Sequence, residues 1–272
     1  MEKPKERFFF YLGLVRILSY LCNSNMKISV TKLQTYLDCP RKYWYKYQLM
    51  IDTPKSEGFY FGSAIHEGLD DYYNGKDPMI GVKGALYGNK KSLSQEAVEG
   101  TDLAKMESDA KRIFDAYKDS APHFEPLLVE HFFTVDLVHP ETLEKLPAQF
   151  VGKIDLITTD CKVIDHKTSS SKPNGFFEYQ NTLQANGYTY AYLRMFGMVP
   201  NMFIFNHIVK GNTKRDPMFV PKPRKVTLGD ACMFFDECKA ALDSVLRNET
   251  RDYPNRDNCR MCPYKNICTY AK

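Results

Sequence analysis

The chain has 272 residues, of which 43% are hydrophobic and 26% are charged, and its formal net charge is +4 at pH 7. This length allows one domain with a substantial hydrophobic core, and the ordinary globular composition excludes a disordered or low-complexity chain. The weakly basic charge permits a polyanionic partner but does not require one.

One segment, residues 8–21, is apolar enough to suggest targeting or membrane anchoring. It is shorter than the roughly 20 residues of a membrane-spanning helix, and Arg16 interrupts it. A signal peptide is an alternative because basic residues precede the segment, although the small-residue cleavage pattern is weak. A self-contained pattern starts at Met26, so we interpret residues 1–26 as an N-terminal extension and residues 27–272 as one domain without membrane association.

The first half of this domain has helical periodicity. Apolar and aromatic residues recur every three or four positions over residues 28–49, with Ser29 as the expected N-cap. Pro40 is expected to divide this helix just after Cys39. A second helix is predicted over residues 59–73 and a charged helix over residues 102–118. The segment between them, residues 74–100, is rich in Gly, Lys and Ser, which favours an insertion or a loop.

The second half changes to strand-like patterns. Segments rich in β-branched and aromatic residues, at 127–138, 149–157 and 162–166, predict three successive strands. After them we predict a helix over 177–196, a strand over 202–209, a basic loop over 210–225 and a final helix over 228–247. Helices on both sides of a group of strands predict an α/β fold.

Two of the predicted strands each end in an aspartate, Asp155 in G-K-I-D and Asp165 in V-I-D-H-K. Asp165 and Lys167 are two residues apart, so on a strand their side chains point to the same face of the sheet. Carboxylate oxygens suit Mg²⁺ or Mn²⁺, and a neighbouring cation helps to activate water for phosphodiester hydrolysis. A single D-x-K triplet is also common by chance, with both side chains in solvent, so the surrounding motifs decide.

Four motifs stand in the order in which they occur in the PD-(D/E)XK nuclease superfamily, and the chain resembles its RecB-like branch over about residues 26–272. They are G-S-A-I-H ending at His66, G-K-I-D ending at Asp155, D-H-K-T-S starting at Asp165, and Q-x3-Y from Gln184 to Tyr188. Each motif alone is weak, whereas the four in order are specific. The resemblance implies a restriction-endonuclease-like core, that is, a mixed central sheet flanked by helices, with a helical N-terminal region and a C-terminal cysteine-cluster segment.

The resemblance also implies the ligands of a catalytic Mg²⁺ or Mn²⁺. Asp155 and Asp165 are expected to bind the ion, with His66 and the backbone carbonyl of His166 completing the shell. The second carboxylate is often a glutamate in the family, and Asp165 is a variation that the superfamily tolerates. A satisfied core histidine is the alternative interpretation of His66.

The remaining site residues follow from the same resemblance. Lys167 is expected to orient the attacking water, while Gln184 and Tyr188, one helical turn apart, present one face towards the site and the DNA. Core packing is the alternative for Tyr188. Glu130, on the preceding strand, either serves as an auxiliary carboxylate or faces solvent.

Three of the eight cysteines form the pattern C-x2-C-x5-C near the C-terminus, at Cys259, Cys262 and Cys268. Disulfides are possible for an even count, but such clustering favours a metal or an iron–sulphur centre in a reducing compartment. A fourth thiolate is needed, and Cys39 in L-D-C-P-R-K-Y is the best candidate. Cys39 precedes the C-terminal three by about 220 residues, so a shared centre would close a very long loop.

This arrangement resembles the iron–sulphur subset of the RecB-like nucleases, which includes the AddB nuclease domain and the CRISPR-associated exonucleases of that type. In that subset one N-terminal cysteine joins three C-terminal cysteines around a [4Fe–4S] cluster. A structural zinc is the alternative, which spacing does not exclude. The other cysteines of the domain are interpreted as ordinary buried residues: Cys161, Cys232 and Cys238.

Two segments mix cations with other side chains that suit nucleic acid. Residues 41–47 (R-K-Y-W-Y-K-Y) could stack bases, but their helical spacing favours packing on the core. Residues 210–225 carry six lysines and arginines against one acid, Asp216, and are the better candidate for phosphate contacts. A solvated basic loop explains this segment equally well.

Together these features predict a cytoplasmic, divalent-metal-dependent deoxyribonuclease. We expect an exonuclease that prefers single strands, with some endonuclease activity, acting in DNA recombination, repair or replication on single-stranded DNA or ended duplexes. The sequence contains no G-x-x-x-x-G-K-[ST] motif, so the chain is not expected to unwind DNA by that route. We expect it to act alone or beside a helicase, recombinase or integrase partner. Two alternatives are a CRISPR adaptation nuclease that trims spacer precursors and a non-catalytic, zinc-stapled DNA-binding protein, which the paired acids disfavour.

Overall fold

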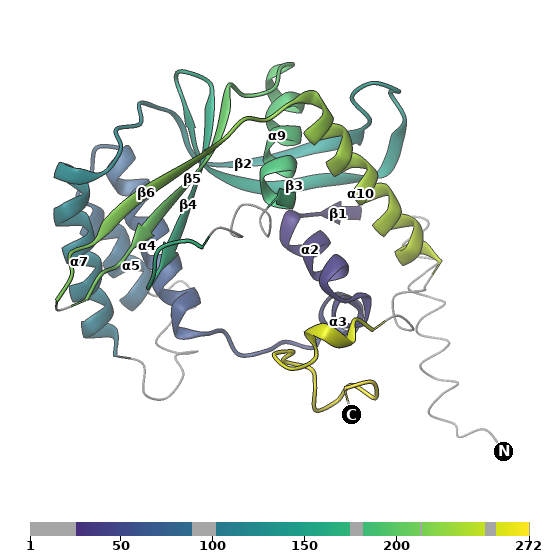
Figure 1. The fold of residues 1–272 in the computed structure, drawn as a ribbon, viewed down its shortest axis with the longest axis horizontal. Coiled ribbons are helices and arrows are strands. Elements are labelled where there is room, and N and C mark those ends of the chain that lie inside the picture. The colour runs from purple at the N-terminus through teal and green to yellow at the C-terminus, as the bar shows by residue number, and fades with distance from the viewer. Residues whose placement is uncertain (1–25, 89–101, 175–181, 213, 248–253, 272) are drawn as a thin grey trace. The chain divides into compact units, whose positions relative to one another are not determined.

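The computed structural model describes residues 26–88, 102–174, 182–212, 214–247 and 254–271 (Figure 1). The chain divides into two compact units. The first comprises Met1–Asp52, Phe133–Gly152 and Leu228–Lys272, and the second comprises Thr53–Phe132 and Lys153–Thr227. The predicted extension, residues 1–26, lies outside the described residues except for Met26. Within the described ranges, no helix combines the length and apolarity needed to cross a membrane.

The strands form a mixed sheet in the order β1-β3-β4-β5-β6, with β2 paired to β3 off this path. The pairs β1–β3 and β4–β5 are parallel, whereas β3–β4 and β5–β6 are antiparallel. This sheet, with helices beside it, confirms the predicted α/β fold class. The strand bounds are β1 Met26–Ile28, β2 Pro126–Val138, β3 Lys145–Thr158, β4 Lys162–Ser169, β5 Met202–Val209 and β6 Met218–Arg224.

In the second unit, three helices lie together beside β4, β5 and β6 (Figure 1). Their apolar faces share one buried cluster, in which α4 approaches its neighbours closely at Gly68. A Cβ added there would lie 2.5 Å from the ring of Phe114 and 2.9 Å from Val82, so the small residue permits this packing. The helices are α4 Glu57–Tyr73, α5 Pro78–Tyr87 and α7 Leu103–Ser120, and α9 Thr182–Phe196 completes the unit.

Two predictions about this unit are wrong. Part of the expected insertion at 74–100 is helix α5, which begins with the N-cap Asp77 and with Pro78 in its first turn. Part of the expected basic loop at 210–225 is strand β6, which pairs with β5 and with no other strand of the described residues. Its prolines Pro221 and Pro223 are two residues apart, so both backbone nitrogens that lack a hydrogen point the same way, which an edge strand tolerates.

In the first unit, the divided N-terminal helix is confirmed. Ser29 caps α2 Val30–Asp38 by accepting a hydrogen bond from the Lys32 backbone, and α3 Pro40–Tyr43 starts anew after an extended Cys39. A π-helical turn, Trp44–Gln48, follows. Helix α10 Leu228–Leu246 buries Phe234 against Phe150 of β3, with 4.5 Å between ring centroids. A 3-10 turn, Arg256–Asn258, precedes the last three cysteines.

Candidate active site

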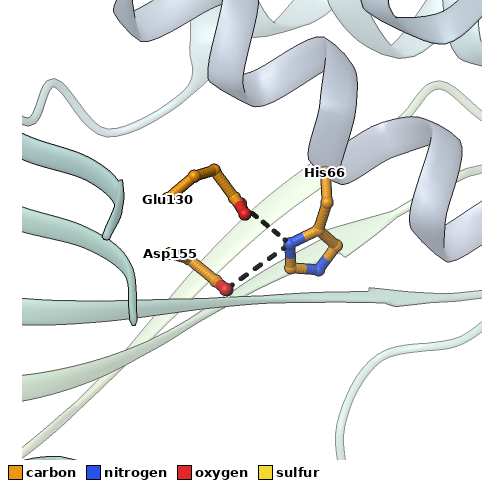
Figure 2. Close-up of side chains that lie close together, drawn as sticks. All are labelled: His66, Glu130 and Asp155. Atoms are coloured by element: carbon orange, nitrogen blue, oxygen red, sulfur yellow. Dashed lines mark ion pairs between the residues drawn. The ribbon is translucent and has the colours of Figure 1, made fainter. Parts of the chain in front are cut away.

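His66 and two carboxylates form the centre of the site in the second unit (Figure 2). His66 lies on α4, Glu130 on β2 and Asp155 on β3. The Nδ1 atom of His66 is 3.5 Å from Glu130 Oε1 and 3.6 Å from Asp155 Oδ1. Among the described residues, these are the one set of three or more His, Cys, Asp or Glu whose ligand atoms all lie within 4.8 Å of one another.

Asp155 is held in place by the neighbouring strand. Its Oδ2 atom accepts a hydrogen bond of 2.7 Å from the backbone N–H of His166 on β4. Its other carboxylate oxygen therefore remains directed at His66. Since Asp155 is itself buried, this backbone bond supports a charge that would otherwise be costly to bury.

Asp165, Lys167 and Gln184 form a closed ring of polar contacts. Lys167 Nζ lies 2.8 Å from Asp165 Oδ2 and donates a hydrogen bond of 2.7 Å to Gln184 Oε1. The amide nitrogen of Gln184 donates in turn to Asp165 Oδ1 at 2.6 Å. The ring fixes the lysine ammonium on the same face of β4 as Asp165, as the spacing of two residues predicts.

Tyr188 is half-buried and His166 is buried. Tyr188 follows Gln184 by one turn on α9, and burial, then the charges of Asp165 and Asp155, raise its pKa above the ordinary value. The imidazole of His166 lies on the opposite face of β4 from its neighbours. Burial, together with the charges of His66 and Lys167, lowers the pKa of His166 to about 3, so this side chain is neutral at pH 7.

The sequence leaves two roles open for Glu130: an auxiliary carboxylate in the site, or a carboxylate that faces solvent. The structure buries most of its side chain, and Lys153 of the G-K-I-D motif forms an ion pair with it. Its backbone φ is +47°, in the left-handed region that strains a residue with a Cβ. Such strain in the middle of a strand is typical of functional positions. No local motif marks Glu130, because its neighbours come from α4 and β3.

The neighbouring charges shift the pKa values of His66 and Asp155. Burial lowers the pKa of His66, but the charge of Asp155 and the ion pair with Glu130 outweigh this effect and raise it to about 9. Burial raises the pKa of Asp155, against the opposing charge of protonated His66. His66 is therefore protonated at pH 7, beside the carboxylates of Glu130 and Asp155. A divalent cation bound there would replace this proton.

The donor set suits a divalent ion. Carboxylate oxygens are the preferred ligands of Mg²⁺ and Mn²⁺, and imidazole is accepted by Mn²⁺. His66, Glu130 and Asp155 supply these atoms from three rigid elements, and Asp165 lies close enough to influence their charges electrostatically. Of the predicted ligands, the structure therefore brings His66 and Asp155 together directly. It adds Glu130, while the carboxylate of Asp165 contacts Lys167 and Gln184.

The four cysteines predicted as cluster ligands line one cavity of about 140 Å³ in the first unit. None of these four cysteines forms a disulfide. The backbone N–H of Asn255 donates to the sulfur of Cys39 at 3.3 Å, and Asn258 donates to the carbonyl of Asp38 at 2.7 Å. Burial raises the pKa of Cys259, and the other three thiols raise it further, because all four lie close together.

Aromatic side chains connect the same two ends of the chain. The rings of Tyr45 and Tyr264 stack with 5.4 Å between centroids. The Tyr45 hydroxyl donates to the carbonyl of Ile267 at 3.2 Å, and the Tyr264 hydroxyl donates to that of Ile51 at 2.8 Å. The N-terminal helices and the C-terminal segment thus form one packed wall around the cysteine cavity.

Comparisons with known proteins point to one family. The family model of the PD-(D/E)XK nuclease superfamily matches residues 27–269. Among solved structures, the chain is similar to one from Eubacterium rectale described as a "Putative exonuclease", with 12% identity, coverage of 97% of this chain and 93% of that chain, and a TM-score of 0.56. It is also similar to SSO0001, with 14% identity, coverage of 100% and 98%, and a TM-score of 0.44. No curated protein matches the sequence.

At 12% identity, the Eubacterium rectale structure supports the fold alone. The family model carries more weight because it spans almost the whole chain, including the four sequence motifs and the residues that converge in the second unit. The chain therefore belongs to the PD-(D/E)XK nuclease superfamily, whose members use divalent metal ions.

Proposed function

We propose that this protein is a DNA exonuclease of the RecB-like, iron–sulphur branch, dependent on Mg²⁺ or Mn²⁺ and selective for single strands. One observation carries the catalytic part of this proposal. His66, Glu130 and Asp155 converge within 4.8 Å, beside a lysine that Asp165 and Gln184 hold in place. A divalent ion held by these three groups, together with a fixed ammonium group on β4, would suit phosphodiester hydrolysis.

Each side chain has a defined task in this scheme. His66, Glu130 and Asp155 would hold the ion, which would supply Lewis-acid activation of water and offset charge on the phosphate. Lys167 orients the attacking water and offsets the negative charge that develops on the phosphate oxygens. The water gives up one proton to solvent, and its oxygen forms a bond to phosphorus. The phosphorus–oxygen bond to the neighbouring nucleotide breaks, and the leaving oxygen takes up a proton from solvent.

The catalytic proposal is tested by digestion of end-labelled single- and double-stranded DNA with Mn²⁺. Asp155→Asn and Lys167→Ala should each lower the cleavage rate by at least about 100-fold, because each removes charge or a donor acting on the transition state. Asp243→Asn and Lys118→Ala alter exposed residues of the same types and should leave the rate unchanged. Full activity of Asp155→Asn, or cleavage that persists in EDTA, would contradict the proposal.

An exposed aromatic ring next to the site supports the preference for single strands. Phe132, two residues after Glu130 on β2, is 77% exposed. The ammonium of Lys153, which pairs with Glu130, lies 5.5 Å from the centre of this ring. An unpaired base can stack on such a ring, and base–aromatic stacking contributes about 1–3 kcal/mol per base. A base inside a duplex has no free face to offer.

Substitution of this ring tests the strand preference. Phe132→Ala should raise KM for single-stranded DNA about tenfold, in line with about 1.4 kcal/mol of lost stacking, while kcat changes little. Phe196→Ala removes another exposed ring, at the end of α9, and serves as the control. Equal KM values for Phe132→Ala and the unmodified protein would rule out the stacking role.

The spacing of the cysteine sulfurs supports an iron–sulphur cluster rather than zinc. A single tetrahedral zinc, with bonds of about 2.3 Å, needs sulfurs only about 3.8 Å apart. No three of the four cavity cysteines have sulfurs within 4.8 Å of one another, although all four line the same cavity. A [4Fe–4S] cluster places its thiolates on separate iron atoms and therefore needs wider spacing.

A nuclease that prefers single strands depends on a source of single-stranded DNA. The 272 residues contain no G-x-x-x-x-G-K-[ST] motif. The proposal includes a helicase, recombinase or integrase partner that supplies single-stranded DNA, together with a role in DNA recombination, repair or replication.

A further inference from the structure

A chain of buried polar side chains lies behind the catalytic strand. His166 occupies the position between Asp165 and Lys167, so its imidazole points to the opposite face of β4. On that face, Asn206 Nδ2 donates to His166 Nδ1 at 3.0 Å and to the Tyr117 hydroxyl at 3.3 Å. None of these contacts belongs to the set that holds the ion or the water.

The row of polar side chains continues to Tyr73 on α4. The hydroxyls of Tyr117 and Tyr73 are 2.8 Å apart, and the ring of Tyr73 stacks on the imidazole of His166 with 5.8 Å between centroids. Tyr73 lies seven residues after His66 on the same helix, so both side chains project from the same face. The polar chain therefore links the helix that carries His66 to the strand that carries Asp165 and Lys167.

The strand register sets His166 of β4 next to Asn206 of β5. His166 and Asn206 are direct partners in the parallel pairing of β4 with β5, so their side chains lie side by side. Asn206 is fully buried and His166 is 2% exposed. Apolar residues of similar size would fill this space without needing hydrogen-bond partners, so burial alone does not account for these residue types.

We propose that Asn206 is a positioning residue for the metal site. By fixing the imidazole of His166, it sets the rotation of the β4 backbone, whose N–H at residue 166 holds the carboxylate of Asp155. By its bond to Tyr117 it ties this strand to α7 and, through Tyr73, to α4. This inference rests on the proposed metal site and adds the groups that set its geometry.

The test measures Mn²⁺ affinity from the electron paramagnetic resonance signal of free Mn²⁺, without DNA. Asn206→Leu and Tyr117→Phe should each weaken Mn²⁺ binding by about tenfold or more, as is typical when a group that orients metal ligands is removed. Both should also broaden the spectrum of bound Mn²⁺, since its ligands are less well fixed. Tyr117→Phe removes one hydroxyl and keeps the ring, so it decides the question if Asn206→Leu does not fold.

Asn186→Leu is the matched control. Asn186 is equally buried in the same unit, but its side chain pairs with Arg224 at 3.0 Å. This variant should lose stability while Mn²⁺ affinity stays within twofold of the unmodified protein. The result separates positioning of the metal site from a general need for buried amides.

The outcomes distinguish this inference from the proposed function. Weakened Mn²⁺ binding in Asn206→Leu or Tyr117→Phe, with normal binding in Asn186→Leu, supports it. Mn²⁺ affinity within twofold of the unmodified protein in the folded variants overturns it, provided that Asp155→Asn loses Mn²⁺ binding. If Asp155→Asn itself binds Mn²⁺ normally, the metal site fails and the inference falls with it.

Discussion

Gln184 connects the two charged groups of the β4 face, because its amide accepts from Lys167 and donates to Asp165. Without it, the ammonium keeps its ion pair but loses a fixed direction. We expect Gln184→Ala to lower kcat about 10- to 100-fold with little effect on KM, the range seen when supporting hydrogen bonds are removed. Gln149→Ala, which removes another glutamine bonded to an aspartate, is the control for steady-state kinetics. Unchanged kcat in Gln184→Ala would contradict the positioning role.

His66 gives the metal-free protein a specific pH dependence. Its folded pKa of about 9 exceeds the ordinary value of 6.5, so its stabilising contribution is complete below pH 6.5 and lost as the pH rises through 9. The raised pKa of Asp155 acts in the same direction, because the folded state again binds the proton more tightly. Thermal unfolding in EDTA should therefore show a melting temperature that falls from pH 6.5 to 9.

Mn²⁺ should reverse this trend, because it takes the place of the proton on His66. The stabilisation by Mn²⁺ should grow with pH up to about 9, because above this pH His66 is already neutral in the metal-free protein. His66→Gln should flatten the pH dependence of the metal-free protein. A melting temperature in EDTA that rises between pH 6.5 and 9 would contradict the predicted loss of stability on deprotonation of His66.

At the scale of elements, helix α5 offers a direct test of packing against α4. A Cβ at Gly81 would collide with the backbone carbonyl of Glu67, whereas a Cβ at Gly84 would meet no atom within 4 Å. Gly81→Ala should destabilise the protein by about 1–2 kcal/mol, because overpacking outweighs the gain of up to about 1 kcal/mol in helix propensity. Gly84→Ala should instead stabilise it by about 0.5–1 kcal/mol. Urea denaturation of both variants measures these differences, and equal effects would refute the close contact.

The two wrong element predictions have different causes. Helix α5 had a readable start signal, the N-cap Asp77 followed by Pro78, which the glycine-rich composition of residues 74–100 outweighed. Strand β6 had no such signal. Its prolines exclude a central strand, and only the pairing with β5 shows that it lies at an edge, where they are accepted.

At the scale of the molecule, the proposed cluster joins the two ends of the first unit. Loss of one thiolate should release the iron and the folding free energy that depends on it. Protein purified without oxygen should be brown with about four irons per chain, and Cys262→Ala should lose colour, iron and several kcal/mol of stability together. Iron analysis, absorbance and thermal unfolding measure these changes.

Cys232→Ala is the matched control, since it removes a thiol of the same unit that lies on α10 and not in the cavity wall. It should stay brown and fully loaded. A colourless protein with one zinc per chain would reject the cluster and leave the nuclease proposal standing. A brown Cys39→Ala protein with its full iron content would show that another group supplies the fourth ligand.

The sequence by itself determined the α/β fold class, most helix and strand positions and the nuclease superfamily. These depend on periodicity, capping residues and short motifs, all of which are local properties of the chain. Only the tertiary structure decided that Glu130 lies beside His66 and that Asn206 lies beside His166. Contacts between side chains on different elements depend on strand register and helix packing, and neither Glu130 nor Asn206 has neighbours in sequence that would reveal them.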